Sequence, residues 1–461
     1  MSRCEGSTIV RHASTVLVGQ LAVIAFGITD TLVAGRFADT ALAALSVGSA
    51  TYISVHISLM GILQALLPIW AELHGAGRQT AVGRSLRQAL YLCVITIAVG
   101  MAILLFPEPI LNWTQVPAEL QAEVREYLSI VALGLPASLL FRMYGTLNQS
   151  LGKPKLVTWV QVGALFVKVP LSILLVMGIP GWLEPMGLAG CAWATLLVNY
   201  LMLGLALWLL KTQDFYHPYR IWSSLERPDW TQLKRFVQLG LPSGLAIGVE
   251  VTSFTLMSLF ISRLGVVATA GHQIASNMAA VLYMVPLALS IASSARVSFW
   301  LGAGDVQRAR RALRAGLVWV IGMACLLATL IGWHREAIAA FYTASPQVAT
   351  LACNLLMWIA LYHLADSVQV FCVFTLRSYG ITVLPLMTYT FVLWGLGLAG
   401  GYAVAYSEFQ FPTFSGLVKG SPISFWQTSS IALCLTAAVL LTVLWRAAYS
   451  FNQPSGQASF S

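Results

Sequence analysis

Three acidic residues stand in the middle of hydrophobic segments. Asp30, Glu250 and Asp366 interrupt the apolar runs VIAFGITDTLVAG, GLPSGLAIGVEV and LMWIALYHLADSVQVF. A carboxylate at mid-bilayer depth costs about 3 kcal/mol or more, so such residues usually face a cavity or a partner and mark the path of an ion or a substrate. The three carboxylates therefore predict a site that handles cations.

Tyr362 adds a neutral oxygen to this set. Tyr362 and Asp366 are four positions apart, so they share one face of a helix. Glu250 and Asp366 with neutral oxygens suit a hard monovalent metal ion such as Na⁺, whereas the same two carboxylates held close together would act as a proton acceptor. The residues alone leave Na⁺ and H⁺ open. A third interpretation, separate structural acids, is less favoured because each buried acid would carry its own cost.

These residues must be positioned by membrane-spanning helices. The chain has 461 residues, of which 58% are hydrophobic and only 9% charged, a composition that excludes an ordinary soluble protein. A run of about 20 apolar residues spans the hydrocarbon core of a bilayer as a helix. We predict twelve such spans, at approximately 12–36, 45–70, 88–107, 127–149, 156–178, 187–210, 236–262, 269–300, 312–333, 347–376, 382–406 and 426–448.

The two halves of the chain repeat one pattern. TDTLVAGRFADTALAALS aligns with LMSLFISRLGVVATAGHQ, which pairs Arg36 with Arg263, and the same offset without a gap pairs Gly77 with Gly304. Six helices per copy is an even number, so the copies enter the membrane from the same side and are related by an axis along its normal. The predicted fold is an all-α polytopic membrane protein with twelve transmembrane helices in two six-helix lobes.

The longest polar stretch divides these lobes. We predict an N-terminal lobe over residues 1–211, a cytoplasmic linker over 212–232, a C-terminal lobe over 233–450 and a polar tail over 451–461. Most of the 26 Lys and Arg residues fall on one side of the predicted membrane, which places both termini in the cytoplasm. The net charge of +9 therefore reflects topology and does not indicate a nucleic-acid partner.

No enzyme motif is present in the sequence. GxSxG, HExxH and P-loop patterns are all missing, and the seven histidines do not cluster with carboxylates. We therefore expect a protein that is not an enzyme and has no cofactor, and that draws on an ion gradient. Gln273 and Asn277 share a face of the span 269–300, which also holds Tyr283, and they either contact a ligand or join helices.

Several segments resemble the NorM branch of the multidrug and toxic compound extrusion (MATE) transporters. They are TDTLVAGR, GLPSGLAIGVEV, AGHQIASNMAAVLYMVPLALSIASSARV and ADSVQVFCVFTLRSYG. The resemblance implies a twelve-helix antiporter that expels organic cations in exchange for Na⁺ or H⁺, with a cation site built on Glu250 and Asp366 near Tyr362. It also implies that Asp30, Gln273 and Tyr283 take part in coupling or drug contact.

The fifth predicted span departs from the pattern of this family. It reads VKVPLS, so Lys168 stands where the family has an amide. A buried ammonium needs a carboxylate partner, and Asp30 is the only acid inside a span of the first lobe. We predict a buried ion pair between Asp30 and Lys168, which would leave the first lobe less able to bind a metal cation.

Taken together, these features predict a monomeric multidrug efflux antiporter of the inner membrane, in contact with drugs and the lipid bilayer. The alternatives are a flippase for a lipid-linked saccharide or a metabolite exporter of the same superfamily. A flippase would need several basic residues in its cavity to hold a diphosphate, and only Arg142, Lys168 and Arg296 qualify. A membrane-embedded enzyme or scaffold is the rival from another class.

Overall fold

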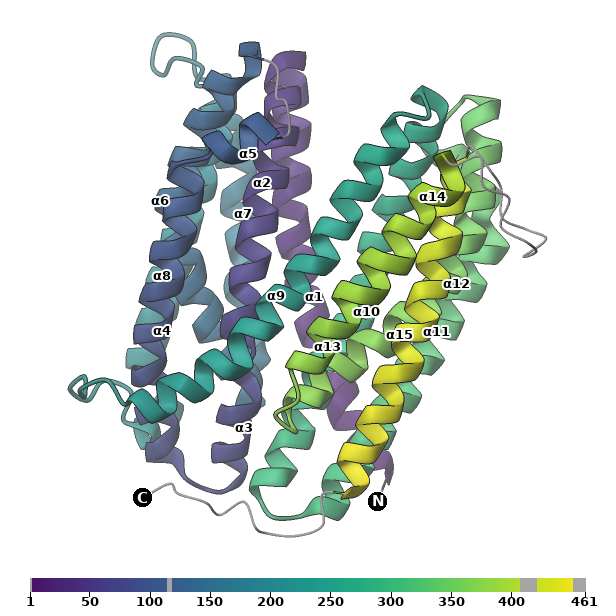
Figure 1. The fold of residues 1–461 in the computed structure, drawn as a ribbon. Helices are drawn as coiled ribbons and strands as arrows, with labels where there is room; N and C mark the ends of the chain where they lie inside the picture. The colour runs from purple at the N-terminus through teal and green to yellow at the C-terminus, as the bar shows by residue number, and fades with distance from the viewer. Residues whose placement is uncertain (1, 114–117, 407–420, 451–461) are drawn as a thin grey trace. The chain divides into compact units, whose positions relative to one another are not determined.

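Long helices form almost all of the regular structure in a computed structural model that describes residues 2–113, 118–406 and 421–450 (Figure 1). Twelve of its helical segments are long and apolar enough to cross a membrane, which confirms the predicted number and order of spans. The predicted tail over 451–461 lies outside the described residues. The elements are α1 (Ser2–Phe37), α2 (Asp39–Gln64), α3 (Leu67–Gly75), α4 (Gln79–Leu105), α5 (Glu108–Trp113), α6 (Ala118–Ser150), α7 (Pro154–Met177), α8 (Leu188–Thr212), η1 (Asp214–Tyr219), α9 (Trp230–Ser262), α10 (Val266–Gly302), α11 (Val306–Tyr342), α12 (Pro346–Arg377), α13 (Val383–Thr388), η2 (Tyr389–Ala399), α14 (Gly400–Tyr406) and α15 (Pro422–Ser450).

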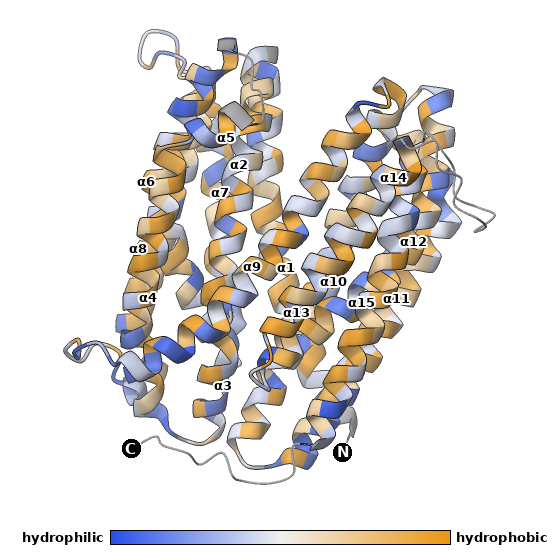
Figure 2. Ribbon diagram, viewed as in Figure 1, coloured by the Kyte–Doolittle hydropathy of each residue, from blue (hydrophilic) through white to orange (hydrophobic). Residues whose placement is uncertain are grey.

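Most helices run beyond the predicted spans. Helices α10 and α11 each have 37 residues, whereas about 20 suffice to cross the hydrocarbon core. Figure 2 shows hydrophobic residues along the middle of the helices and hydrophilic residues gathered toward their ends. Large apolar side chains such as Phe166 and Trp333 are exposed, as expected of surfaces that face lipid. The longest helices therefore exceed the length that a crossing of the hydrocarbon core requires.

The helices pack into two compact units. One holds residues 15–244, here called the N-unit, and the other holds residues 1–14 with 245–461, here called the C-unit. Both boundaries fall inside helices, α1 and α9, whereas the sequence predicts a division at the polar stretch 212–232. The first turns of α1 thus belong to the C-unit, and the first half of α9 belongs to the N-unit.

Each unit is built around one helix that corresponds in the repeat. Helix α6 packs against α2, α4, α7 and α8 in the N-unit, and α12 packs against α10, α11 and α15 in the C-unit. Helix α6 ends at Ser150 and α12 at Arg377, which keeps the offset of Gly77 and Gly304. Both of these glycines have left-handed backbone, with φ of 72° and 75°. The repeat in the sequence is therefore a repeat in the fold.

The segment between α8 and α9 is fastened to α4 of the N-unit. A side chain at Gly83 would lie 1.8 Å from the carbonyl oxygen of Tyr219, so only glycine permits this approach. Arg87 Nε donates to Glu226 Oε2 at 2.9 Å, and Tyr91 Oη donates to the Glu226 carbonyl at 2.8 Å. The hydrogen bond from Arg87 lowers the pKa of Glu226. The predicted linker is thus a packed part of the N-unit.

Two spans are not continuous α-helices. The second breaks at Ala65 and Leu66 between α2 and α3, and the eleventh passes from α13 through the π-helix η2 into α14. π-Helical turns are rare and often occur at functional sites. Prolines do not break the other spans: Pro136, Pro170, Pro242 and Pro286 lie inside continuous helices, and Pro385 lies in the first turn of α13.

Candidate functional site

Glu250 of α9 and Asp366 of α12 meet at one amide group. Gln369 Nε2 donates to Glu250 Oε1 at 3.2 Å and to Asp366 Oδ1 at 3.0 Å. Asp366 is 4% exposed, and Gln369 is fully buried. The structure therefore brings together the two acids that the sequence paired. Gln369 was missed, although its spacing of three residues from Asp366 places it on the same helix face.

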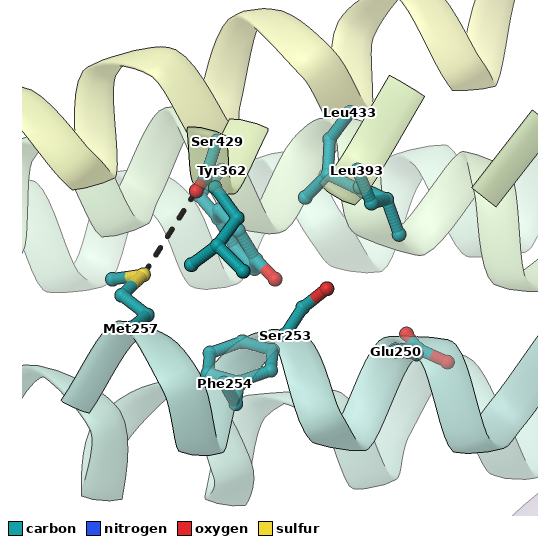
Figure 3. Close-up of a pocket in the computed structure, with 9 residues that line it drawn as sticks. Glu250, Ser253, Phe254, Met257, Tyr362, Leu393, Ser429 and Leu433 are labelled. Carbon is teal, nitrogen blue, oxygen red and sulfur yellow. Dashed lines mark hydrogen bonds between the residues drawn. The ribbon is translucent and has the colours of Figure 1, made fainter. Parts of the chain in front are cut away.

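A small cavity opens beside Glu250. In Figure 3, Glu250, Ser253, Phe254 and Met257 project from α9 toward side chains of α12, η2 and α15, which include Tyr362. The cavity has a volume of about 30 Å³. One water molecule needs roughly 10–15 Å³ by this measure, and drug-sized ligands occupy pockets of about 300 Å³ or more. In this conformation the cavity has room for a small ion or one or two water molecules and not for a drug-sized ligand.

Aromatic rings form one end of this cavity. The ring of Tyr362 lies 6.0 Å from that of Phe254 and 5.3 Å from that of Trp426, both in edge-to-face arrangements. Trp426 is held from behind, because its Nε1 donates to His272 Nδ1 at 3.2 Å, and His272 Nε2 lies 2.8 Å from Ser258 Oγ. Aromatic faces attract cations, so the carboxylates and the rings together favour positive charge.

The oxygen atoms available here suit a hard cation. Ser253 Oγ and Gln369 Oε1 are buried and have no hydrogen-bond partner among the described residues. Together with the carboxylates of Glu250 and Asp366 they supply the oxygen donors that hard cations require. Within the described part of the chain, no three His, Cys, Asp or Glu side chains gather as a metal site. The donor set thus fits Na⁺ or a proton better than a transition metal.

The polar residues of α10 occupy two different environments. Gln273 and Asn277 are exposed on the C-unit, and Gln273 Nε2 donates to Asn277 Oδ1 at 3.0 Å. Tyr283 is half-buried and interacts electrostatically with both Glu250 and Asp366. Only Tyr283 therefore belongs to the surroundings of the acidic cluster. The amides of Gln273 and Asn277 form a separate pair.

Asp30 and Lys168 form a buried ion pair in the N-unit. Lys168 Nζ lies 2.8 Å from Asp30 Oδ1, and Lys168 is fully buried. Ser172 Oγ donates to Asp30 Oδ1 at 3.2 Å and Thr195 Oγ1 to Asp30 Oδ2 at 3.3 Å, while Lys168 Nζ also donates to Thr195 at 2.6 Å. Every charge in this group is thus matched by an opposite charge and by hydroxyl groups. Asp30 belongs to a different unit from Glu250, Asp366, Gln273 and Tyr283.

Comparison with known proteins places the chain in a family. The family model described as MatE matches residues 16–174 and 242–403. The chain belongs to the MatE family. It is 36% identical to the probable multidrug resistance protein NorM of Aromatoleum aromaticum over 95% of this chain and 94% of that protein. It is 34% identical to the multidrug resistance protein PmpM of Pseudomonas aeruginosa over 97% and 93% of the two chains.

Solved structures of MATE transporters share the fold. The bent form of the Vibrio cholerae MATE transporter VcmN matches with a TM-score of 0.83 at 15% identity, covering 97% of this chain and 98% of that one. Membership in the MatE family confirms the predicted NorM-like resemblance and the prediction of a transporter that is not an enzyme. The twelve apolar helices and the bacterial relatives make it a multi-pass protein of the inner membrane.

Proposed function

We propose that this MATE protein is a secondary-active multidrug efflux antiporter. It exports organic compounds, mostly cationic, in exchange for Na⁺ or H⁺ by alternating access, as a monomer with both termini in the cytoplasm. The observation that carries this proposal is the pair of buried acids, Glu250 and Asp366, joined by Gln369 beside a cavity with aromatic walls. The names of the NorM and PmpM relatives support multidrug export.

The cluster couples two cations by competition for the same negative charge. A coupling ion at Glu250 and Asp366 neutralises the carboxylates, and a cationic substrate is attracted only when that charge is free. The low dielectric of the buried cluster strengthens both interactions relative to water. Ser253 and Tyr362 offer neutral oxygens toward the same cavity. Release of one cation thus makes binding of the other favourable.

Two of the three basic residues that a saccharide flippase could use, Lys168 and Arg296, are engaged by carboxylates. Lys168 is paired with Asp30, and Arg296 Nε donates to Glu5 Oε2 at 2.7 Å while its Nη2 donates to Glu5 Oε1 at 3.0 Å. A diphosphate group would have to displace these carboxylates. The arrangement therefore favours a cationic substrate over an anionic one.

Dye efflux from proteoliposomes tests the proposed function. Purified protein is reconstituted into liposomes that contain ethidium. A Na⁺ gradient and then a proton gradient are imposed across the liposome membrane, without ATP. We expect efflux to accelerate with one of the two gradients and to stop when that gradient is collapsed by an ionophore. Efflux that ignores both gradients would contradict antiport. Glu250→Gln serves as the matched inactive variant.

A further inference from the structure

Arg377, the last residue of α12, is buried without a hydrogen-bond partner. It is 3% exposed, and none of its three guanidinium nitrogens finds an acceptor among the described residues. Its nearest aromatic contact is Phe374 of its own helix, with the guanidinium carbon 4.3 Å from the ring centre. Arginine does not lose its proton in proteins, so it cannot escape burial by becoming neutral. An unpaired buried charge is costly, and another charge must offset it.

The position of Arg377 on α12 directs it toward the acidic cluster. Asp366 and Arg377 are separated by about three helical turns, so they lie on the same stripe of the helix. Side chains on a helix slope toward its N-terminus, which carries the long arginine side chain back toward Gln369 and Asp366. The stripe therefore bears an acid, an amide and a guanidinium in order.

Arg377 shares its buried surroundings with one of the two acids and with two tyrosines. Arg377 interacts with Glu250 of α9, with Tyr283 of α10 and with Tyr389, the first residue of the π-helix η2. Tyr389 is 1% exposed and interacts in turn with Glu250 and Asp366. The guanidinium is thus linked to the cluster through Glu250, which shares the amide of Gln369 with Asp366.

We propose that Arg377 is the built-in counter-cation of Glu250 and Asp366. The three side chains together carry one net negative charge, so the cluster accepts a single further positive charge in each cycle. This inference rests on the proposed antiport: one Na⁺, one proton or one cationic substrate group neutralises the remaining charge of the cluster. When that cation leaves, Arg377 still neutralises one of the two carboxylate charges.

A double-mutant cycle on thermal stability tests the pairing without any transport assay. Arg377→Gln leaves two carboxylates with no counter-charge, and we expect the unfolding temperature of the purified protein to fall by several degrees. Glu250→Gln alone leaves one acid and one guanidinium in the cluster and should cause little change. The double variant should regain most of the stability lost by Arg377→Gln, because only one carboxylate then remains.

Arg377→Lys is the matched control, because it keeps the charge and changes the shape. It should remain closer to the unsubstituted protein than Arg377→Gln does. Additive losses in the double variant, or equal losses for Gln and Lys at this position, would overturn the proposal. Should Arg377→Gln fail to accumulate in membranes, restored accumulation of the double variant supports the pairing and its absence contradicts it.

The charge moved per cycle gives a second, independent measurement. Exchange of one positive charge for one ethidium cation moves no net charge, so transport should not respond to a membrane potential set with potassium and valinomycin. Arg377→Gln doubles the negative charge of the cluster, and any efflux it retains should become sensitive to that potential. Insensitive efflux by this variant would contradict the proposal. If the unsubstituted protein shows no gradient-driven efflux, antiport fails while the stability cycle still decides the pairing.

Discussion

The two units of the molecule each bury acidic side chains, but they balance the charge differently. In the N-unit, Asp30 accepts hydrogen bonds from Ser172 and Thr195 and lies 2.8 Å from the ammonium of Lys168. In the C-unit, Glu250 and Asp366 share a single neutral amide donor among the described residues. Asp30 therefore has an opposite charge and hydroxyl donors in direct contact, whereas Glu250 and Asp366 have only the shared amide within the described part of the chain.

This difference bears on which unit we expect to exchange cations. A cation that entered the N-unit would have to displace a bonded ammonium and lose its hydrogen bonds, which offsets most of the gain. A cation that enters the C-unit instead relieves repulsion between two carboxylates. We therefore propose that ion coupling belongs to the C-unit and that the pair in the N-unit has a structural role.

The largest expected effect comes from removing the acids of the C-unit. Glu250→Gln and Asp366→Asn should each abolish gradient-driven efflux while leaving folded protein in the membrane, because each removes the charge that the ion must neutralise and also relieves repulsion. Initial rates of ethidium efflux from proteoliposomes at matched protein content provide the measurement.

An acid outside the cluster provides the control for this loss. Glu336 is exposed on α11, so Glu336→Gln removes a carboxylate without touching the cavity and should leave efflux unchanged. Normal efflux by Glu250→Gln or Asp366→Asn would remove the C-unit cluster from the mechanism. Unfolded protein in either case would instead indicate a structural role for these acids.

The next largest effect concerns the ion pair of the N-unit. Asp30→Asn strands a buried ammonium and should cost roughly 3–5 kcal/mol of stability. Lys168→Asn should cost less, because Asp30 keeps hydrogen bonds from Ser172 and Thr195. The variant with both substitutions should recover stability relative to Asp30→Asn, as measured by thermal unfolding of purified protein.

Lys155 offers a matched comparison on the same helix. It is exposed near the start of α7, so Lys155→Asn should change stability by no more than about 0.5 kcal/mol. Additive losses at Asp30 and Lys168 would show that the two residues do not stabilise each other. Lys168→Asn also frees the charge of Asp30, so a new ion dependence in that variant would sharpen the contrast between the units.

Much of this arrangement follows from the sequence because membranes impose strong constraints. Lipid requires long apolar helices, so composition and length predict all twelve spans. Charged residues inside such spans are rare enough to need partners, so the sequence alone pairs Asp30 with Lys168 and Glu250 with Asp366. A constant offset between the halves predicts the repeat.

The parts that were not predicted depend on packing between distant segments. Arg377 ends an apolar run just before a turn, where a charge is usually solvated, so its position in the sequence is typical of a residue that only sets topology. Its burial depends on neighbours from α10 and η2 that the sequence does not place. The π-helical turn at Tyr389 and the support of Trp426 by His272 likewise arise from contacts between separate helices.

A smaller effect should follow from altering the neutral groups of the C-unit cluster. Gln369→Leu removes hydrogen bonds to both carboxylates, and we expect the ion concentration for half-maximal efflux to change by roughly tenfold. Tyr362→Phe keeps the ring contacts with Phe254 and Trp426 and should change it only a few-fold. Efflux measured over a series of ion concentrations distinguishes the two variants. A larger effect of Tyr362→Phe than of Gln369→Leu would contradict this ranking.

The smallest effect is expected for the polar residues of α10, and it should concern the substrate more than the ion. Gln273 is exposed and bonded to Asn277, so Gln273→Ala loses a hydrogen bond worth about 1 kcal/mol and should shift the efflux of individual dyes only a few-fold. If Gln273 contacts substrates, the ranking among several cationic dyes should change while the dependence on the coupling ion stays the same. Tyr283→Phe, which alters a residue beside the acids, should affect both the ranking of dyes and the dependence on the ion.

Asn277→Ala is the matched control for Gln273→Ala, because it breaks the same amide pair and leaves Gln273 in place. Equal losses for every dye in both amide variants would mean that the pair acts through helix packing, and the acidic cluster of the C-unit would then be the sole determinant of selectivity among those tested.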